Sequence, residues 1–197
     1  EARNAKAGDK VKVTGVVACI TNAFGMVPNG VYLVDNSGAI YVYGGDVAAQ
    51  VSVGNTITVA AEKTYYINPD ESGFANKYGY EGALQLQSPI LLENDKGNTE
   101  FNKSWIETST VKDIIETGME NNITSNIYKV NAFVNKVPGS GFTNYYINDL
   151  DGKTGSYVYT MCNGNDFGWL DEFDGKICTI YLSPINYKST ASGCVVR

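Results

Sequence analysis

The stretches VKVTGVV (11–17), VYLVDNSGAIYVY (31–43) and GNTITVA (54–60) decide the fold class of this chain. In the first of them Val11, Val13 and Gly15 alternate with lysine and threonine, which is the period of a strand that buries one face. Between the two valine-rich parts of the second stretch stands Asp-Asn-Ser-Gly, a turn sequence. The three stretches therefore predict strands joined by turns and loops.

The same order of strands and turns recurs in the second half of the chain. It appears there as YKVNAFV (128–134), YYINDLDGKTGSYVY (145–159) and GKICTIYL (175–182). Scaffold positions of the two copies correspond in pairs, namely Val13 with Val130, Asp35 with Asp149 and Gly54 with Gly175. A repeated all-β unit is typical of a tandem binding scaffold more than of a single active site.

Five strands with a helix or link between the third and fourth have the order of the OB-fold, a small Greek-key barrel. We therefore expect an all-β protein with short helices, built as two consecutive five-stranded OB-fold barrels. The polar stretch NDKGNTEFNKS (94–104) is the natural linker. It places the first domain at residues 1–95 and the second at residues 105–197.

A family resemblance rests on two motifs of the first copy. These are G-x-K-V-x-V-x-G-V-V, which begins at Gly8, and the later x-Y-x-x-D-x-x-G-x-I-x-V, within residues 1–60. The segment resembles the OB-fold domains of secreted and surface proteins of bacteria, which often stand beside extracellular nucleases, phosphoesterases or other surface modules. The resemblance implies an extracellular or cell-surface location and a larger parent protein. It carries no catalytic residues, and in the second copy Ala132 replaces Gly15.

Composition limits the possible functions. The chain has 15 basic against 21 acidic residues, a net charge of −6 and no histidine. A protein that holds nucleic acid through phosphates needs a basic groove, so this balance counts against tight nucleic-acid binding. The lack of histidine removes the commonest general base and zinc ligand. We expect no cofactor and no metal, and the lack of a long apolar run predicts no membrane span.

The four cysteines, Cys19, Cys162, Cys178 and Cys194, form no CxxC motif. A zinc site or a redox pair is therefore not expected. Cys178 falls at a core-phase strand position and is interpreted as a small buried side chain. A disulfide among the last three is an alternative if the protein is exported, and spacing does not choose the pairing.

An OB-fold binds its ligands on the face of strands 2 and 3, between the first loop and the loop joining strands 4 and 5. Aromatic residues gather in these segments of the first copy, which makes them the ligand-binding candidates: Tyr41, Tyr43, Tyr65, Tyr66, Phe74, Tyr78 and Tyr80. Ring faces beside amides and carboxylates suit a sugar or a stacked base. The alternative is that these rings close the barrel end or pack at the joint between domains.

These observations predict a non-catalytic extracellular binding module of a larger bacterial protein, with carbohydrate as its ligand. The alternatives are a nucleic-acid-binding accessory domain of a secreted nuclease and a purely structural spacer. The long aromatic loop occurs only in the first copy, so we expect that copy to carry any ligand and the second to support it.

Overall fold

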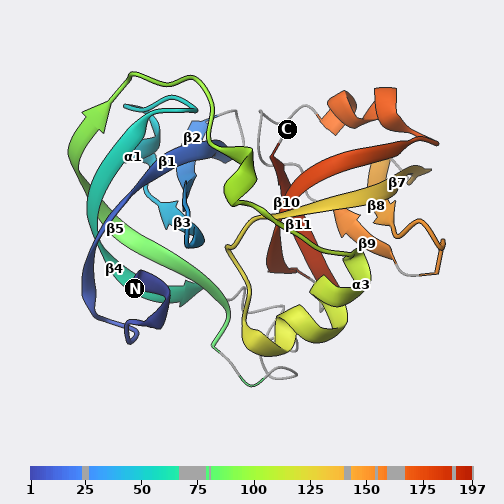
Figure 1. Ribbon diagram of the computed structural model, residues 1–197, viewed down its shortest axis with the longest axis horizontal. Helices are drawn as coiled ribbons and strands as arrows, with labels where there is room; N and C mark the ends of the chain where they lie inside the picture. The colour runs from blue at the N-terminus through green and yellow to red at the C-terminus, as the bar shows by residue number, and fades with distance from the viewer. Residues whose placement is uncertain are drawn as a thin grey trace.

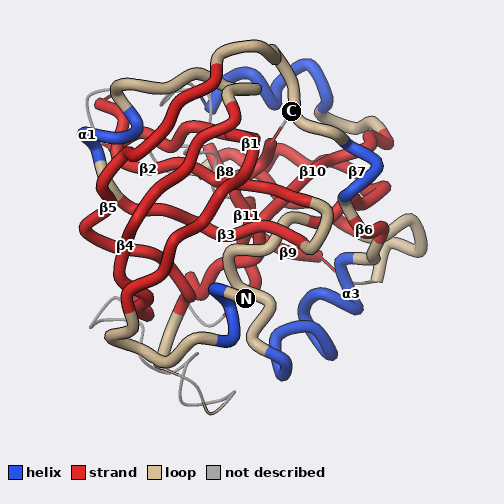
Figure 2. Tube along the Cα trace, turned by 60° about the vertical axis from the view of Figure 1, so that its left-hand side comes forward, coloured by secondary structure: helices blue, strands red, loops and turns tan. Residues whose placement is uncertain are grey.

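The structure is a computed structural model that describes residues 1–23, 27–66, 79, 81–139, 143–153, 155–158, 167–187 and 190–196. Two groups of strands lie side by side, and the short helical segments lie around them (Figures 1 and 2). The first group comprises η1 (Ala2–Asn4), β1 (Lys10–Ala23), β2 (Val27–Asp35), β3 (Gly38–Tyr43), α1 (Gly45–Ala48), β4 (Thr56–Tyr66) and β5 (Ala83–Asp95).

The second group begins with helical turns and continues with strands. Its elements are η3 (Lys103–Trp105), β6 (Glu107–Thr108), α3 (Val111–Asp113), η4 (Ile114–Gly118), η5 (Met119–Asn121), β7 (Tyr128–Pro138), β8 (Thr143–Asn148), β9 (Gly155–Val158), η6 (Phe167–Phe173), β10 (Ile177–Tyr187) and β11 (Thr190–Val196). In the described part of the chain, no helix has the length and apolar character needed to cross a membrane.

The first group is a closed barrel with the strand order β1-β2-β3-β5-β4. Strand β1 closes it, because Lys10–Val16 pairs with β4 and Val16–Ala23 pairs with β2. Strand β3 runs parallel to β5, and the other neighbours are antiparallel. The predicted all-β class, with a closed five-stranded barrel and short helices, is confirmed.

The glycine in the V-T-G-V-V stretch has a steric cause. A Cβ atom on Gly15 would lie 3.2 Å from both the Leu33 Cβ and the Val34 carbonyl oxygen. Strand β1 passes close over β2 at this point, where it changes from one partner strand to the other. A side chain at this position would require its neighbours on β2 to shift by a few tenths of an ångström.

The second group forms a six-stranded sheet in the order β10-β11-β9-β8-β7-β6, in which β10 also pairs with β7. This differs from the five strands expected, because the two-residue strand β6 adds to β7 in parallel. Strand β7 pairs with two partner strands, as β1 does: Tyr128–Phe133 pairs with β10, and Phe133–Pro138 pairs with β8.

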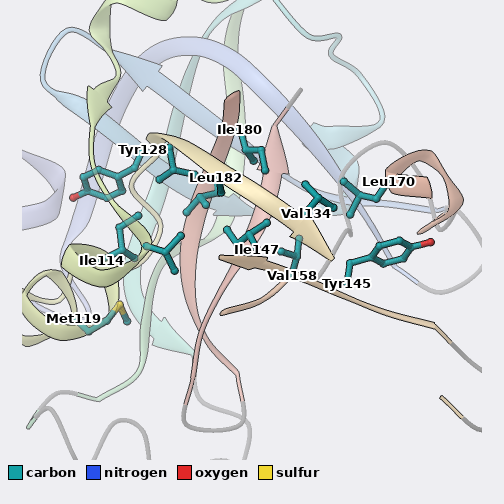
Figure 3. Packing of buried hydrophobic residues seen from close by; sticks show 13 residues of the cluster. Ile114, Met119, Tyr128, Val134, Tyr145, Ile147, Val158, Leu170, Ile180 and Leu182 are labelled. Carbon is teal, nitrogen blue, oxygen red and sulfur yellow. The ribbon is translucent and has the colours of Figure 1, made fainter. Parts of the chain in front are cut away.

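Each group has its own apolar core. In the first, residues such as Val17, Leu33 and Ile57 are at most 2% exposed. In the second, the strands contribute together with η6 and with α3, η4 and η5, which we call the helical segment. Figure 3 shows Ile114 and Met119 near one end of this cluster and Tyr145 and Leu170 near the other.

A third cluster joins the two groups. It contains Cys19, Tyr32 and Ala39 from the first barrel together with Phe101, Ile106 and Ile127 from the segment that follows it. Trp105, Tyr41 and Tyr181 pack against this cluster. The polar stretch 94–104 thus contains one buried aromatic residue, Phe101, although its other residues from 95 to 104 are exposed. The predicted domain boundary at this stretch stays a prediction.

The N-terminal segment also bridges the two groups. The Arg3 guanidinium donates to the carbonyl oxygens of Ala39 at 3.2 Å and of Asn122 and Thr124 at 3.0 Å. The buried Lys63 ammonium donates in turn to the Arg3 carbonyl at 2.6 Å. These charge-assisted bonds anchor the first residues across the joint.

Candidate functional site

The predicted ligand face of the first barrel is covered around Tyr41. The Tyr41 ring lies over Gly30, where an added Cβ atom would be 2.3 Å from the Tyr41 hydroxyl oxygen. That hydroxyl is 2.8 Å from the Thr21 Oγ1 atom, and the ring centroid is 4.8 Å from that of Tyr32. Tyr32 belongs to the cluster that joins the two groups, and Tyr41 packs against it, so this part of the face is occupied by the joint.

Burial changes the acidity of these groups. It raises the pKa of Tyr41 from 10.0 to about 12, and the hydrogen bond with Thr21 partly offsets this shift. Burial also raises the pKa of Tyr32, with a smaller opposing effect of the Ser183 hydroxyl from the second group. Both phenols therefore stay protonated at neutral pH.

The other predicted site residues are dispersed. Tyr43 and Tyr66 are 50% and 54% exposed. Their partners on β5 are Gln87 and Ala83, which lie about 13 Å apart at roughly 3.3 Å per strand residue. Tyr65 packs against the barrel core, and its ring centroid is 5.2 Å from the Lys63 Nζ atom. Phe74, Tyr78 and Tyr80 lie outside the described residues.

The second sheet presents an open polar and aromatic face instead. Along β7, Asn131, Phe133 and Asn135 point away from a core formed by the alternating residues Val130, Ala132 and Val134, which are 0% exposed. Phe133 is paired with Asn148 of β8, and Asn135 with Tyr146. Two exposed apolar side chains flank this surface: Leu150 in the turn after β8, 60% exposed, and Ile177 at the start of β10, 66% exposed.

A recess of about 290 Å³ opens on this face. Its lining combines amides, a carboxylate, apolar side chains and a turn glycine: Phe133, Asn135, Asn148, Asp149, Leu150, Gly152 and Ile177. The Asn135 Nδ2 atom donates to the Asn148 Oδ1 atom at 2.5 Å. One strand away, the Thr179 hydroxyl donates to the Asn131 Oδ1 atom at 2.8 Å. We call this surface the β7–β8 face, and its lined recess the amide recess.

The turn beside the amide recess is held by Asp149. Its carboxylate accepts the backbone N–H groups of Val111 and Lys112, both at 2.8 Å, at the start of the helical segment. Its carbonyl accepts the N–H of Gly152, which has a φ of +69°. The Asp-rich turn thus caps a helix and shapes the recess.

The acidic cluster of η6 has a structural role. Asp171 pairs with the Lys136 ammonium at 2.8 Å and accepts the Tyr145 hydroxyl at 2.5 Å. Lys136 and then Tyr145 lower the pKa of this carboxyl. Asp174 accepts the Lys136 backbone N–H at 2.8 Å. These acids tie η6 to the end of β7. Among the described residues, no group of three or more histidine, cysteine, aspartate or glutamate side chains could hold a metal.

Two cysteines can be placed. Cys19 is a buried free thiol at the joint, and Cys178 is a half-buried free thiol against the second core. Burial raises the pKa of both thiols. A disulfide that involves Cys178 is therefore absent from this structure. Cys162 lies outside the described residues.

The sequence contained a signal for the β7–β8 face that the search for aromatic loops missed. Asparagine is depleted in strands, yet β7 and β8 each carry two, at Asn131 and Asn135 and at Asn144 and Asn148. Four asparagines on two paired strands indicate a surface suited to hydrogen bonding.

Comparisons with known proteins give structural neighbours only. No family model and no curated protein matches the chain. A murine DNA-binding protein bound with double-stranded DNA is similar at 11% identity and a TM-score of 0.44, over 94% of this chain and 95% of that chain. The HINa domain of Ifi202 in complex with a 20-base-pair double-stranded DNA is similar at 14% identity and a TM-score of 0.41, over 95% and 93%.

The prediction of a glycan-binding module in the first copy is corrected by the geometry of the site on which it rested. The second group and the segment before it cover the part of the expected face around Tyr41, and the exposed Tyr43 and Tyr66 lie apart from each other.

Proposed function

We propose that this chain is a non-catalytic nucleic-acid-binding module that contacts bases through the β7–β8 face. The observation that carries the proposal is the combination of an aromatic ring, exposed apolar side chains and strand asparagines around the amide recess. Aromatic and apolar surfaces stack on bases, and side-chain amides form hydrogen bonds with base edges.

We further infer that the second sheet is a barrel of the same OB-fold kind as the first. The support for this is its pairing: β7 with β8, β8 with β9, β9 with β11, β11 with β10, and β10 with β7. In such a barrel β7 and β8 correspond to the first two strands, next to the usual ligand face. The first barrel then supports the second. An extracellular role in a larger bacterial protein stays a prediction.

Charge predicts the character of the binding. Two of the lysines near the β7–β8 face have protein partners: Lys136 pairs with Asp171, and Lys176 donates to the Glu172 carbonyl at 2.7 Å. With a net charge of −6, phosphate neutralisation contributes little. We expect moderate affinity and a shallow salt dependence, with a slope of log K against log salt of about −1 to −2.

The test compares two exposed isoleucines on the outer faces of the two groups. Ile177 lines the amide recess at 66% exposure, and Ile90 of β5 is 64% exposed on the first barrel. We expect Ile177→Ser to weaken binding of a labelled mixed-sequence oligonucleotide by about tenfold, or roughly 1.4 kcal/mol, and Ile90→Ser to leave it unchanged. Fluorescence anisotropy over a salt series measures both quantities.

Two results would contradict the proposal. If neither single- nor double-stranded oligonucleotides bind the wild type at low salt, the chain is a structural spacer. Equal losses in both variants would place the contact away from the β7–β8 face.

A further inference from the structure

We infer that the amide recess takes one unpaired base of a single strand, whose edge is read by Asn135 and Asn148. This inference rests on the proposed function and specifies its ligand. It follows from the size of the recess, from its walls and from the hydrogen-bonding groups that its two asparagines leave unused.

The size and walls suit one base. A recess of about 290 Å³ lies at the small end of ligand pockets, which span roughly 300–1,000 Å³. A duplex presents its bases inside grooves, at least about 6 Å wide and more than 7 Å deep, and cannot insert one of them without opening the pair. Phe133 and Ile177 form adjacent apolar surface, since they are directly paired across β7 and β10, and Leu150 lines the recess as well.

The asparagine pair presents a donor beside an acceptor. Asn135 donates one Nδ2 hydrogen to the Asn148 Oδ1 atom, and this leaves the Asn135 Oδ1 atom as an acceptor and the Asn148 amide hydrogens as donors. The Watson–Crick edge of every base carries at least one donor next to an acceptor. In a duplex those groups are already paired, so only an unpaired base can satisfy both asparagines with that edge.

The pair is held in place before a ligand arrives. The mutual hydrogen bond fixes both amides, and Asn148 lies against Gly155 of β9, where an added Cβ atom would be 2.2 Å from the Asn148 Nδ2 atom. The next residue, Asp149, is fixed by its two bonds to the helical segment. A preorganised donor and acceptor lose little entropy on binding.

Gly155 therefore offers a variant that moves the amide without removing it. In Gly155→Ala the new methyl group displaces Asn148, while the backbone does not need the left-handed region. The matched control is Asn121→Ala, which removes an exposed asparagine of η5 that donates to the Thr117 carbonyl at 3.0 Å and does not line the recess.

The experiment measures anisotropy with a single-stranded oligonucleotide and with its duplex. We expect the wild type to bind the single strand at least tenfold more tightly. Gly155→Ala and Asn135→Ala should lose about five- to a hundredfold of single-strand affinity, as for a bidentate base contact. Asn121→Ala should bind like the wild type.

A second measurement needs no variant. Single-stranded oligonucleotide added to the wild type should shift the side-chain amide NMR signals of Asn135 and Asn148 more than that of Asn131. Unshifted Asn135 and Asn148 signals at saturation, or duplex binding as tight as single-strand binding, would overturn the inference and leave the proposed function intact. No binding of either nucleic acid would remove both.

Discussion

At the residue scale, the joint between the two groups encloses groups that ionise in alkaline solution. Tyr41 contacts Thr21 and Tyr32, and Cys19 lies in the same cluster. Tyr41 was predicted as a ligand contact, with packing at the joint as the alternative, and the second of these is what the structure contains. The alternation of Tyr41 with Ile40 and Val42 predicted only that its ring points away from the barrel core.

Stability should therefore fall at alkaline pH. Burial raises the pKa of Cys19 and Tyr32 and brings that of Tyr41 from 10.0 to about 12, so the unfolded state loses these protons first. Their contribution is fully present below about pH 9 and is lost as the pH rises to 12 and beyond. For Tyr41 the loss is on the order of 2 kcal/mol.

Urea denaturation at pH values between about 8 and 11 measures this effect. The variant Tyr41→Phe cannot ionise, and its stability should fall less steeply with pH than that of the wild type. Parallel curves for the two proteins would show that Tyr41 is not buried in solution.

At the element scale, the corresponding glycines of the two copies have different roles. Gly54 and Gly175 both have positive φ, +90° and +71°. A Cβ atom on Gly54 would lie 2.3 Å from the Thr99 carbonyl carbon, whereas one on Gly175 would meet nothing within 4 Å. Both positions favour glycine because both have a positive φ. Only at Gly54 does the segment that follows β5 also leave no room for a side chain.

The substitution Gly54→Ala should therefore cost more stability than Gly175→Ala. The left-handed backbone lowers the free energy of unfolding of both variants by about 1–2 kcal/mol. In Gly54→Ala the new methyl group also clashes with main-chain atoms that must move. Thermal or urea unfolding of the two variants measures the difference. Equal losses would mean that the 95–100 segment does not pass over Gly54.

At the scale of the whole molecule, the two groups should unfold as one body. Phe101 is 6% exposed and packs edge-to-face on Tyr181, with ring centroids 6.0 Å apart. Arg3 and Asn126 add hydrogen bonds across the same joint. Rings that pack in this way fix two domains more firmly than a polar interface does.

Removal of the Phe101 ring tests this rigidity. Phe101→Ala should lose about 3–5 kcal/mol and make residues 94–104 sensitive to limited proteolysis, which the wild type should resist. Leu92→Ala, at a site 48% exposed on β5, is the control and should stay resistant. Rapid cleavage of the wild type at 94–104 would contradict a fixed joint.

The sequence by itself determined the strands, their order and the positions of the turns. Alternation in VKVTGVV, the Asp turns and the glycines act over a few residues, and such local preferences can be read from the chain. They predicted the closed first barrel. They also predicted a second unit with the same order of strands. The structure has these strands in its second group, and it adds the short strand β6.

Only the tertiary structure decided which face remains open. Tyr41 and Asn148 both point out of a strand, and nothing in their local sequence distinguishes a covered face from an exposed one. The difference arises because Phe101 and Tyr181, distant in the chain, pack over the first barrel and leave β7 and β8 accessible. Burial between units depends on contacts far apart in sequence, so the functional surface followed from packing and not from pattern.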